Sequence, residues 1–340
     1  MISSEFDFPS YTAGAGLANG HLQSILPSLF RRVTVPYERH RLELDDGDFL
    51  LVDSLRAEAE EAPMVILSHG LEGNSHRPYI QGMARHFHQA GWHVLAWNFR
   101  GCGGEPNRLP RFYHSGAFGD LRAVIRHGLS LGASRIALVG FSMGGNQTLL
   151  TLAEPDLEPE VMGGLGFSVP LDLAACAGAL AKPAQRIYMR RFLRDLKLKI
   201  ADKAERFPDL VSLDGYDHIR NFKQFDDRYT APLHGFYNAE DYWHRCSSGR
   251  ALPRLQRPAL VVNALDDPFL APGCYRSSGQ NSSNLHMESP LRGGHCGFMR
   301  WRLNQPLWSE QRALNFAQAL LEQRPASTSS RIRPASIEVA

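Results

Sequence analysis

The chain has 340 residues, enough to bury one large core or a core with an inserted segment. Its 37 lysines and arginines nearly balance 35 aspartates and glutamates, and the resulting net charge of +2 gives no argument for a nucleic-acid partner. The five cysteines are scattered and form no Cys-x-x-Cys pair, which is typical of reduced thiols in a reducing compartment. No signal-peptide pattern opens the sequence and no run of about 18 apolar residues occurs, so we expect a soluble cytoplasmic protein.

The first part of the chain is predicted to be an irregular segment followed by a hairpin. We expect residues 1–40 to form an N-terminal segment that packs on the core, and its part before residue 33 to be irregular. Residues 33–44 and 49–57 have the composition of strands. They flank the sequence DDGD at 45–48, a turn signal that favours a hairpin.

Further along, short apolar runs alternate with helical patterns. We predict strands over 63–70, 92–101, 135–142, 161–170, 258–267 and 285–291. We predict helices over 77–91, 116–132, 144–154 and 310–323. Apolar strands that alternate with helices indicate an α/β fold, with a mostly parallel central sheet and helices on both faces. The core then comprises residues 41–168 and 258–323, and the Pro/Ser-rich residues 324–340 are predicted to be a disordered tail.

The alternation breaks between residues 169 and 257, where the chain is helical, aromatic and charged. This stretch leaves and re-enters the sheet at its carboxyl edge, where open α/β sheets bind ligands, so we predict a helical lid over that edge. Within it, residues 185–207 form one helical pattern with eight Arg/Lys against three Asp/Glu. The basic positions are either a solvated helix face or a contact for a membrane surface or an anionic substrate.

The sequence GFSMGG at 140–145 stands between a predicted strand and a predicted helix. Gly140, Ser142 and Gly144 form a Gly-x-Ser-x-Gly pattern, in which the glycines permit a sharp turn that exposes the serine hydroxyl. The pattern alone is also compatible with an ordinary tight turn and a capping serine. In this context it favours Ser142 as a nucleophile, because the helix that follows directs its amide groups toward developing negative charge.

A serine nucleophile needs a base and a residue that orients the base. His295 lies in the glycine-rich segment LRGGHCGF, which favours a loop that presents its side chain. The acid is expected at the end of the preceding strand, where Asp266 and Asp267 are adjacent. We choose Asp267 because the Pro-Phe-Leu that follows it resembles the turn found after such acids, and Asp266 remains the alternative.

Acyl transfer also requires hydrogen-bond donors for an oxyanion. The amide of Met143, directly after the serine, is one candidate donor. The amide of Leu71, in the segment HGLEG after the strand at 63–70, is the other. Because no histidines or cysteines have the spacing of a metal site, we expect no metal.

These motifs together resemble the α/β-hydrolase superfamily and, more narrowly, its YheT-like group of esterases, which is related to eukaryotic α/β-hydrolase-domain proteins that act on lipid esters. The resemblance spans most of residues 10–320 and is carried by NGHLQSILPSLFRR, HGLEGNSHRPYI, NFRGCGGEPN, FYHSGAFGDL, GFSMGGN, NALDDPF and GGHCGF. The chain order Ser142, Asp267, His295 is also the order of that superfamily. The resemblance implies a triad of these three residues, carboxylester hydrolase activity and no cofactor.

We therefore expect a serine hydrolase that cleaves carboxylic esters, with short to medium or lipid-like acyl groups, through an acyl-enzyme. An acyltransferase or a thioesterase is the alternative, since a different acceptor can resolve the same acyl-enzyme. A non-catalytic binding module is the remaining alternative. The expected partner is a small-molecule ester and not a nucleic acid, with weak membrane contact through the basic helix as an option, and the sequence does not specify the oligomeric state. The lid is expected to form the acyl pocket.

Overall fold

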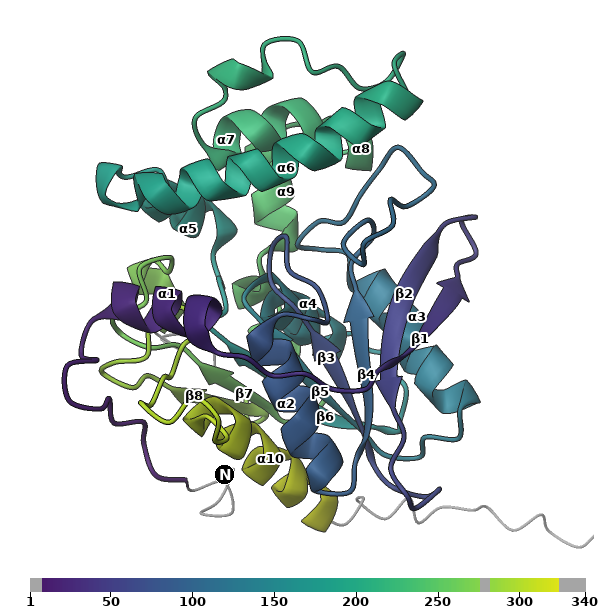
Figure 1. The fold of residues 1–340 in the computed structure, drawn as a ribbon. Coiled ribbons are helices and arrows are strands. Elements are labelled where there is room, and N and C mark those ends of the chain that lie inside the picture. Colours follow the sequence, from purple (N-terminus) through teal and green to yellow (C-terminus); the bar gives the residue numbers. More distant parts are fainter. Residues whose placement is uncertain (1–7, 276–281, 324–340) are drawn as a thin grey trace, which may run out of the picture.

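The computed structural model describes residues 8–275 and 282–323, and its centre is one β-sheet (Figure 1). Within the described residues eight strands lie in the order β1-β2-β4-β3-β5-β6-β7-β8. These are β1 Glu38–Glu43, β2 Phe49–Leu55, β3 Met64–Ser68, β4 His93–Asn98, β5 Ile136–Phe141, β6 Val161–Phe167, β7 Ala259–Val262 and β8 Leu285–Glu288. β2 pairs antiparallel with β1 and with β4, and the other pairings are parallel.

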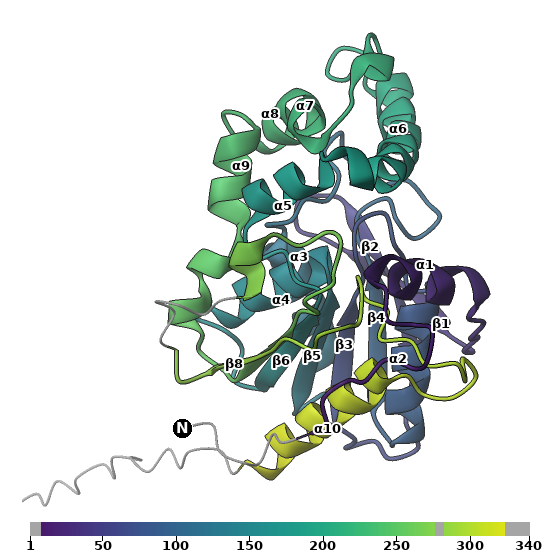
Figure 2. The ribbon, with the colours of Figure 1, turned by 90° about the vertical axis from the view of Figure 1, so that its left-hand side faces the viewer.

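Helices cover both faces of the sheet, as Figure 2 shows. α2 and α10 pack on one face, and α3 and α4 pack on the other. The bounds are α2 Pro78–Gln89, α3 Phe118–Ser130, α4 Met143–Leu152 and α10 Trp308–Glu322. Successive side chains of a strand point to opposite faces, and in β3 Val65 and Leu67 join the cluster of α2 and α10, whereas Met64 and Ile66 join that of α3 and α4. The predicted α/β fold with a mostly parallel, doubly covered sheet is confirmed.

The N-terminal segment contains a helix that the sequence analysis does not predict. α1 spans Gly20–Phe30, and the side chain of Asn19 caps it by accepting hydrogen bonds from the amides of His21 and Leu22 at 2.9 and 3.1 Å. Pro27 lies inside this helix and obscured it, because proline removes one backbone donor from a helix interior. The prediction of an irregular segment is therefore wrong over these residues.

Several strands are shorter than predicted: β7 ends at Val262, five residues before the end of the predicted strand at 258–267, and both edge strands are shortened as well. β1 begins only at Glu38, where its pairing with β2 begins opposite Ser54. Pro36 lacks the amide hydrogen that a strand ladder uses, so residues 33–37 do not extend the strand. β8 ends at Glu288, three residues before the end of the predicted strand at 285–291. The predicted tail at 324–340 lies outside the described residues.

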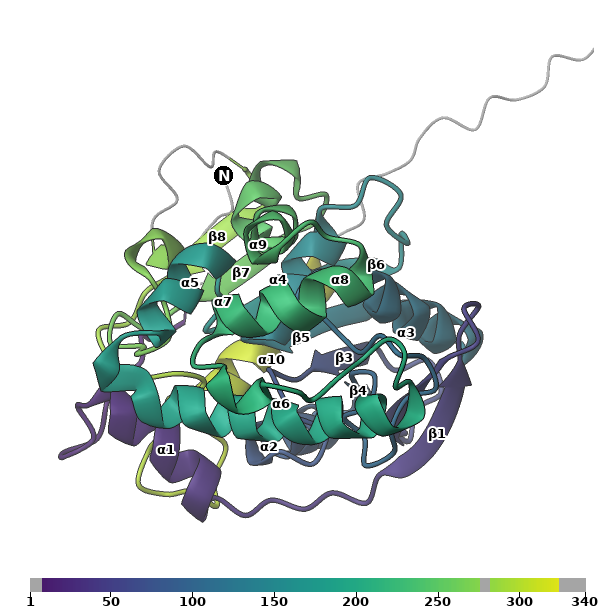
Figure 3. The same cartoon turned by 90° about the horizontal axis from the view of Figure 1, so that it is seen from above.

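Residues 169–257, which we call the cap, form a layer of helices beyond the carboxyl ends of the parallel strands (Figure 1). The cap helices are α5 Leu173–Leu180, α6 Arg186–Arg206, α7 Phe222–Phe225, α8 Ala231–His234 and α9 Ala239–Cys246. A π-helical turn, Asp226–Thr230, joins α7 to α8. Figure 3, which looks down on the cap, shows α6 crossing the molecule next to α1, and the Tyr188 hydroxyl lies 3.0 Å from Nδ1 of His21.

One side of α6 packs on the rest of the protein. Its buried residues recur every three or four positions and include Met189, Leu193, Leu196 and Ile200. These side chains belong to the same apolar cluster as α3 and α4, so the cap and the core share one hydrophobic interior. The opposite side is basic and exposed, as at Arg194. A contact of that side with a membrane surface or an anion stays a prediction.

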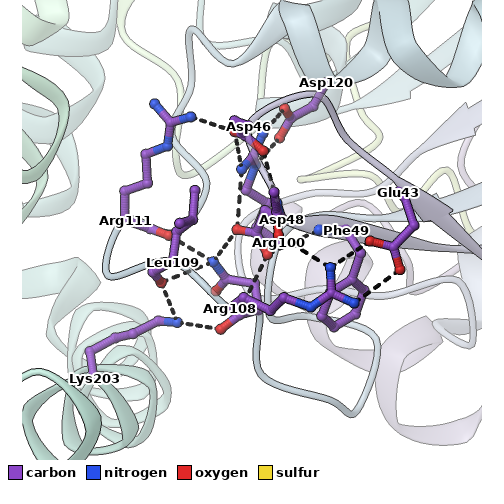
Figure 4. Close-up of polar contacts among 12 residues, drawn as sticks. Glu43, Asp46, Asp48, Phe49, Arg100, Arg108, Leu109, Arg111, Asp120 and Lys203 are labelled. Atoms are coloured by element: carbon purple, nitrogen blue, oxygen red, sulfur yellow. Dashed lines mark hydrogen bonds and ion pairs between the residues drawn. The ribbon is translucent and has the colours of Figure 1, made fainter.

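A buried ion-pair network around Arg100 ties the loop after β4 to its surroundings (Figure 4). The Arg100 guanidinium donates two hydrogen bonds to Asp120 of α3, at 2.7 and 2.8 Å. It also donates to Asp46 at 2.7 Å and to Asp48 at 3.1 Å, both in the turn between β1 and β2. Buried charges are tolerated when such partners replace the lost solvent, so these four residues depend on one another.

The cap contacts the same loop through Lys203 of α6 (Figure 4). Its ammonium donates to the carbonyl oxygens of Asn107 and Leu109, each at 2.8 Å. Burial lowers the pKa of Lys203 to about 8, and the two carbonyl groups partly replace the solvent that the ammonium has lost. The hairpin, the loop and the cap are therefore held together by polar contacts as well as by the apolar cluster.

We expect Arg100→Met to lower the free energy of unfolding by about 3 to 5 kcal/mol, because it leaves three carboxylates without their common cation. Arg111→Met is the matched control. Arg111 also pairs with Asp46, but its side chain is 44% exposed, so the expected loss is below about 1 kcal/mol. Chemical denaturation measures both free energies of unfolding. Equal losses would show that the buried ion pairs of Arg100 stabilise the protein no more than the exposed pair of Arg111.

Candidate active site

Ser142 occupies the turn between β5 and α4 in a strained backbone conformation. Its φ of 52° and ψ of −117° lie in a region that residues with a side chain rarely adopt. The turn is held from both sides, because the Ser142 amide donates to the carbonyl oxygen of Phe167 at 2.8 Å and the Ser142 carbonyl accepts from the amide of Asn146 at 3.0 Å. These contacts stabilise a conformation that serine alone would avoid.

The neighbouring glycines are required by close packing of the backbone. A Cβ atom on Gly140 would lie 2.3 Å from the carbonyl oxygen of Gly144. A Cβ atom on Gly144 would lie 2.4 Å from the carbonyl oxygen of Ser68, the last residue of β3, and one on Gly145 would lie 2.7 Å from Cγ2 of Val169. The sequence GFSMGG is thus explained by a sharp turn that packs directly against the end of the neighbouring strand.

His295 and Asp267 form a hydrogen-bonded pair near this turn. Nδ1 of His295 lies 2.9 Å from Oδ2 and 3.1 Å from Oδ1 of Asp267. The side chain of Asp267 is fully buried, and that of His295 is 13% exposed. The amide of Phe269 donates to Oδ1 of Asp267 at 2.9 Å, and its ring packs against the imidazole with 4.2 Å between centroids. These contacts hold the imidazole with Nδ1 toward the carboxylate.

Asp266, the alternative acid, contacts the backbone of the histidine loop and not the imidazole. Its Oδ1 accepts a hydrogen bond from the amide of Gly294 at 2.9 Å. Its buried Oδ2 has no hydrogen-bond partner among the described residues and lies 3.9 Å from Nη1 of Arg292. Asp266 therefore holds the backbone next to His295, whereas Asp267 contacts the imidazole itself. The structure brings together His295 and the aspartate that we chose.

The electrostatics of His295 are dominated by two opposing effects. Burial by itself lowers the pKa of the imidazole, because it disfavours the charged form. The carboxylate of Asp267, with a further contribution from Cys296, outweighs this effect and raises the pKa to about 10. The site therefore favours the imidazolium, the form that His295 would take after accepting a proton.

Two serines that the sequence analysis misses hold the loop of His295. Oγ of Ser24, in α1, accepts a hydrogen bond from the amide of His295 at 2.8 Å and donates to the carbonyl oxygen of Gly20 at 2.6 Å. Oγ of Ser168, just after β6, accepts from the amide of Cys296 at 2.8 Å. The N-cap of α1 is a sequence signal for that helix, but no local pattern indicates that it reaches the histidine loop.

The two predicted oxyanion donors lie at the cavity that Ser142 and His295 also line. Across residues 8–275 and 282–323, the amides of Leu71 and Met143 donate to no acceptor. Met143 is the first residue of α4, where amide groups have no partner within the helix. Both amides are therefore free to bind a ligand oxygen.

The loop that carries Leu71 is anchored on each side of its free amide. The amide of Gly70 donates to the hydroxyl of Tyr79 at 3.0 Å. The amide of Glu72 donates to the hydroxyl of Tyr113 at 3.1 Å, and Glu72 adopts a φ of 51°. The conformation of the loop is thus determined by tyrosines from two other segments.

The cap also reaches this loop. The carboxylate of Glu72 accepts a hydrogen bond from the hydroxyl of Tyr113 at 2.5 Å and lies 3.6 Å from Nζ of Lys199, in α6. Lys199 also donates to the carbonyl oxygen of Gly101 at 2.7 Å. The ammonium of a cap residue therefore connects the two loops that follow β3 and β4.

Two cavities meet at Ser142, His295 and Leu71. The first lies under the cap, and its wall is mainly apolar. Cap residues that line it include Leu173, Phe192, Leu196, Phe222 and Trp243. The second lies toward α1 and is more polar. Residues that line it include Ser24, Ser28, Arg77, Tyr188 and Arg191. The candidate site can thus accommodate two chemically different groups, one on each side of the serine.

Within the part of the chain that the structure describes, no group of three or more His, Cys, Asp or Glu side chains is arranged to hold a metal ion. None of the helices described is both long enough and apolar enough to cross a bilayer.

We expect Gly144→Ala to lower the free energy of unfolding by about 3 kcal/mol, because the new methyl group meets backbone atoms that cannot move aside. Gly178→Ala is the control, since Gly178 is exposed in α5 and has no atom within 4 Å of its Cβ position. That substitution should be neutral or stabilise the protein by up to about 1 kcal/mol. Thermal or chemical denaturation distinguishes them, and a stable Gly144→Ala variant would contradict the packing argument.

Comparisons with known proteins identify the family to which this fold belongs. The family model described as alpha/beta hydrolase fold matches residues 63–300. The chain is 36% identical over 315 residues to the candidate esterase YheT of Escherichia coli (strain K12), which covers 90% of this chain and 92% of that protein. It is 27% identical over 309 residues to the phospholipase ABHD3 of Mus musculus, which covers 87% of this chain and 75% of that protein.

Solved structures show the same fold at lower identity. The Pyrococcus furiosus esterase Pf2001 has a TM-score of 0.55 and 15% identity, over 86% of this chain and 98% of that one. Est1E of Butyrivibrio proteoclasticus, with ferulic acid bound, has a TM-score of 0.54 and 16% identity, over 84% of this chain and 100% of that one. Because the family model spans the parallel strands β3 to β8 and YheT matches over nearly its whole length, the chain belongs to the α/β-hydrolase family, in the group that includes YheT.

Proposed function

We propose that this hydrolase cleaves carboxylic esters through a covalent acyl-enzyme formed on Ser142. The observation that carries the proposal is the strained serine turn at the same cavity as a histidine that is paired with a buried aspartate. A serine hydroxyl becomes a strong nucleophile only when a base removes its proton, and a base acts best when a third group orients it. Ser142, His295 and Asp267 supply these three roles.

The reaction follows from these positions. Oγ of Ser142 attacks the ester carbonyl carbon while Nε2 of His295 takes the hydroxyl proton, and Asp267 stabilises the imidazolium that forms. The amides of Leu71 and Met143 donate hydrogen bonds to the oxyanion of the tetrahedral intermediate. His295 then returns the proton to the leaving alcohol as the C–O bond breaks. Water then takes the place of the alcohol: it attacks the acyl carbon while His295 accepts its proton, and His295 returns that proton to Oγ of Ser142 as the carboxylic acid leaves.

The two cavities support an ester with one long apolar part. The apolar wall under the cap is suited to an acyl chain, and the polar cavity toward α1 is suited to the alcohol. Among the relatives, ABHD3 is named as a phospholipase and human ABHD2 as a monoacylglycerol lipase, which favours lipid-like esters for this chain as well. Adding an alcohol or thiol acceptor to the assay distinguishes hydrolysis from acyl transfer by the partition of products.

We expect Ser142→Ala and His295→Ala each to lower kcat/KM for a p-nitrophenyl ester by at least about ten-thousandfold, because the residues act as one unit. Asp267→Asn should lower it by about the same factor, since the amide favours the wrong imidazole tautomer. Steady-state kinetics and labelling by a fluorophosphonate probe measure these effects.

Asp266→Asn is the matched control for the acid, because it makes the same change one residue away. It removes the negative charge that lies 3.9 Å from Arg292 but keeps an oxygen that can accept from the amide of Gly294, so we expect a loss of no more than about tenfold. If Asp267→Asn kept full activity and Asp266→Asn were inactive, Asp266 and not Asp267 would be the residue that orients His295. Failure of the wild-type protein to react with the probe would contradict the proposed function.

We expect kcat/KM to rise with pH, with an apparent pKa above the ordinary histidine value of about 6.5. Only neutral His295 can accept the proton, and the carboxylate of Asp267 raises the pKa of this imidazole. Asp267→Asn removes that charge, so the residual activity should follow a limb at lower pH. A wild-type limb at or below about 6.5 would show that Asp267 does not perturb the base.

A further inference from the structure

The apolar cavity under the cap contains one carboxylate that the proposed mechanism does not use. Asp226 lines this cavity together with Thr230 and Trp243. It lies in the π-helical turn after α7, on the cap side, whereas Ser142 and His295 belong to the core side. Among the described residues of the wall, Asp226 is the sole aspartate or glutamate, and no lysine or arginine accompanies it.

Asp226 is buried, with 8% exposure, and its protein partners are neutral. Its Oδ1 accepts a hydrogen bond from Oγ1 of Thr230 at 2.6 Å, and its Oδ2 accepts one from Nε1 of Trp243 at 2.8 Å. In the described part of the chain it forms no ion pair. Each carboxylate oxygen can accept about two hydrogen bonds, so half of the acceptor capacity of Asp226 is unused.

The two neutral donors compensate only in part for the burial of this carboxylate, because they reach different oxygens and leave one acceptor site on each. Burial disfavours the ionised form and raises the pKa of Asp226 to about 7. A hydrogen-bond donor from a ligand in the cavity would compensate for the lost solvent, whereas an alkyl chain would leave the carboxyl group uncompensated.

We propose that Asp226 is a specificity-determining residue that accepts a hydrogen bond from a hydroxyl or a protonated amine on the acyl chain of the substrate. The proposal rests on the function proposed above, because it requires the acyl chain to occupy the cavity under the cap. The substrate class is then esters of hydroxyacyl or aminoacyl chains, in place of simple fatty acyl esters. Because Asp226 lies at a fixed distance from Ser142, the hydroxyl or amine must lie at a matching distance from the ester carbonyl along the acyl chain.

The first experiment compares p-nitrophenyl esters of plain, ω-hydroxy and ω-amino acids over chains of about six to about twelve carbons. With wild-type protein, one of the two substituted series should exceed the plain series in kcat/KM by roughly ten- to hundredfold at one chain length, with little advantage at others. The hydroxy and amino arms identify the donor. Equal rates for all three series at every length would overturn the proposal while leaving the esterase function intact.

The second experiment uses Asp226→Asn, with Asp227→Asn as the matched control. Asp227 is exposed on the same turn and pairs with Lys223, so its substitution makes the same change in charge outside the cavity. Asp226→Asn should reduce the advantage of the substituted ester to less than about threefold, and Asp227→Asn should preserve it. A uniform loss of rate for plain and substituted esters in Asp226→Asn would indicate a structural role and overturn the proposal.

A binding measurement makes the proposal independent of turnover. Calorimetry of wild-type protein with the plain, hydroxy and amino free acids of the best chain length should show roughly tenfold tighter binding of one substituted acid. If no ester were cleaved at any length, the same calorimetric comparison would be made over the whole range of chains. Equal affinities would then overturn the role of Asp226, and unequal affinities would support it while the esterase function failed.

Discussion

The candidate site depends on one steric constraint, the contact between the backbone of the Ser142 turn and the end of β3. Because Gly144 lies against the carbonyl oxygen of Ser68, the first turn of α4 and the loop after β3 are in direct contact. The amides of Met143 and Leu71 belong to these two segments, so the same contact brings both candidate oxyanion donors to the serine. Residues that are distant in sequence are positioned here by backbone packing, with no flexible side chain between them.

The cap is part of this arrangement and not a separate layer. Its longest helix shares the apolar cluster of the core through residues such as Leu193 and Ile200. It also contacts the loops of the site through Lys199, which lies beside Glu72 and Gly101. Any movement of α6 away from the sheet would therefore break buried polar contacts as well as expose apolar surface, which couples access to the cavity to the loop that presents Leu71.

The histidine loop shows how support for a reactive group comes from several distant segments. Asp267 holds the imidazole, Asp266 holds the amide of Gly294, and Ser24 of α1 holds the amide of His295. A group that must accept and return a proton benefits from a fixed orientation, because misalignment weakens each transfer. The N-terminal helix therefore supports the site, although nothing in its own sequence is typical of a catalytic segment.

Local patterns were sufficient to predict the alternation of apolar strands and helices, the serine turn and each of the three candidate residues, because every one of these motifs consists of residues close together in the chain. The turn after Asp267 favoured it over Asp266 in the sequence, but the different contacts of the two adjacent aspartates, both with a loop 28 residues away, appear only in the structure. The same holds for Ser24, which reaches His295 across 271 residues, and for Asp226, whose place in the cavity wall depends on the folding of the cap over the sheet. These features come from long-range packing, and no short-range spacing in a sequence encodes which distant surfaces will meet.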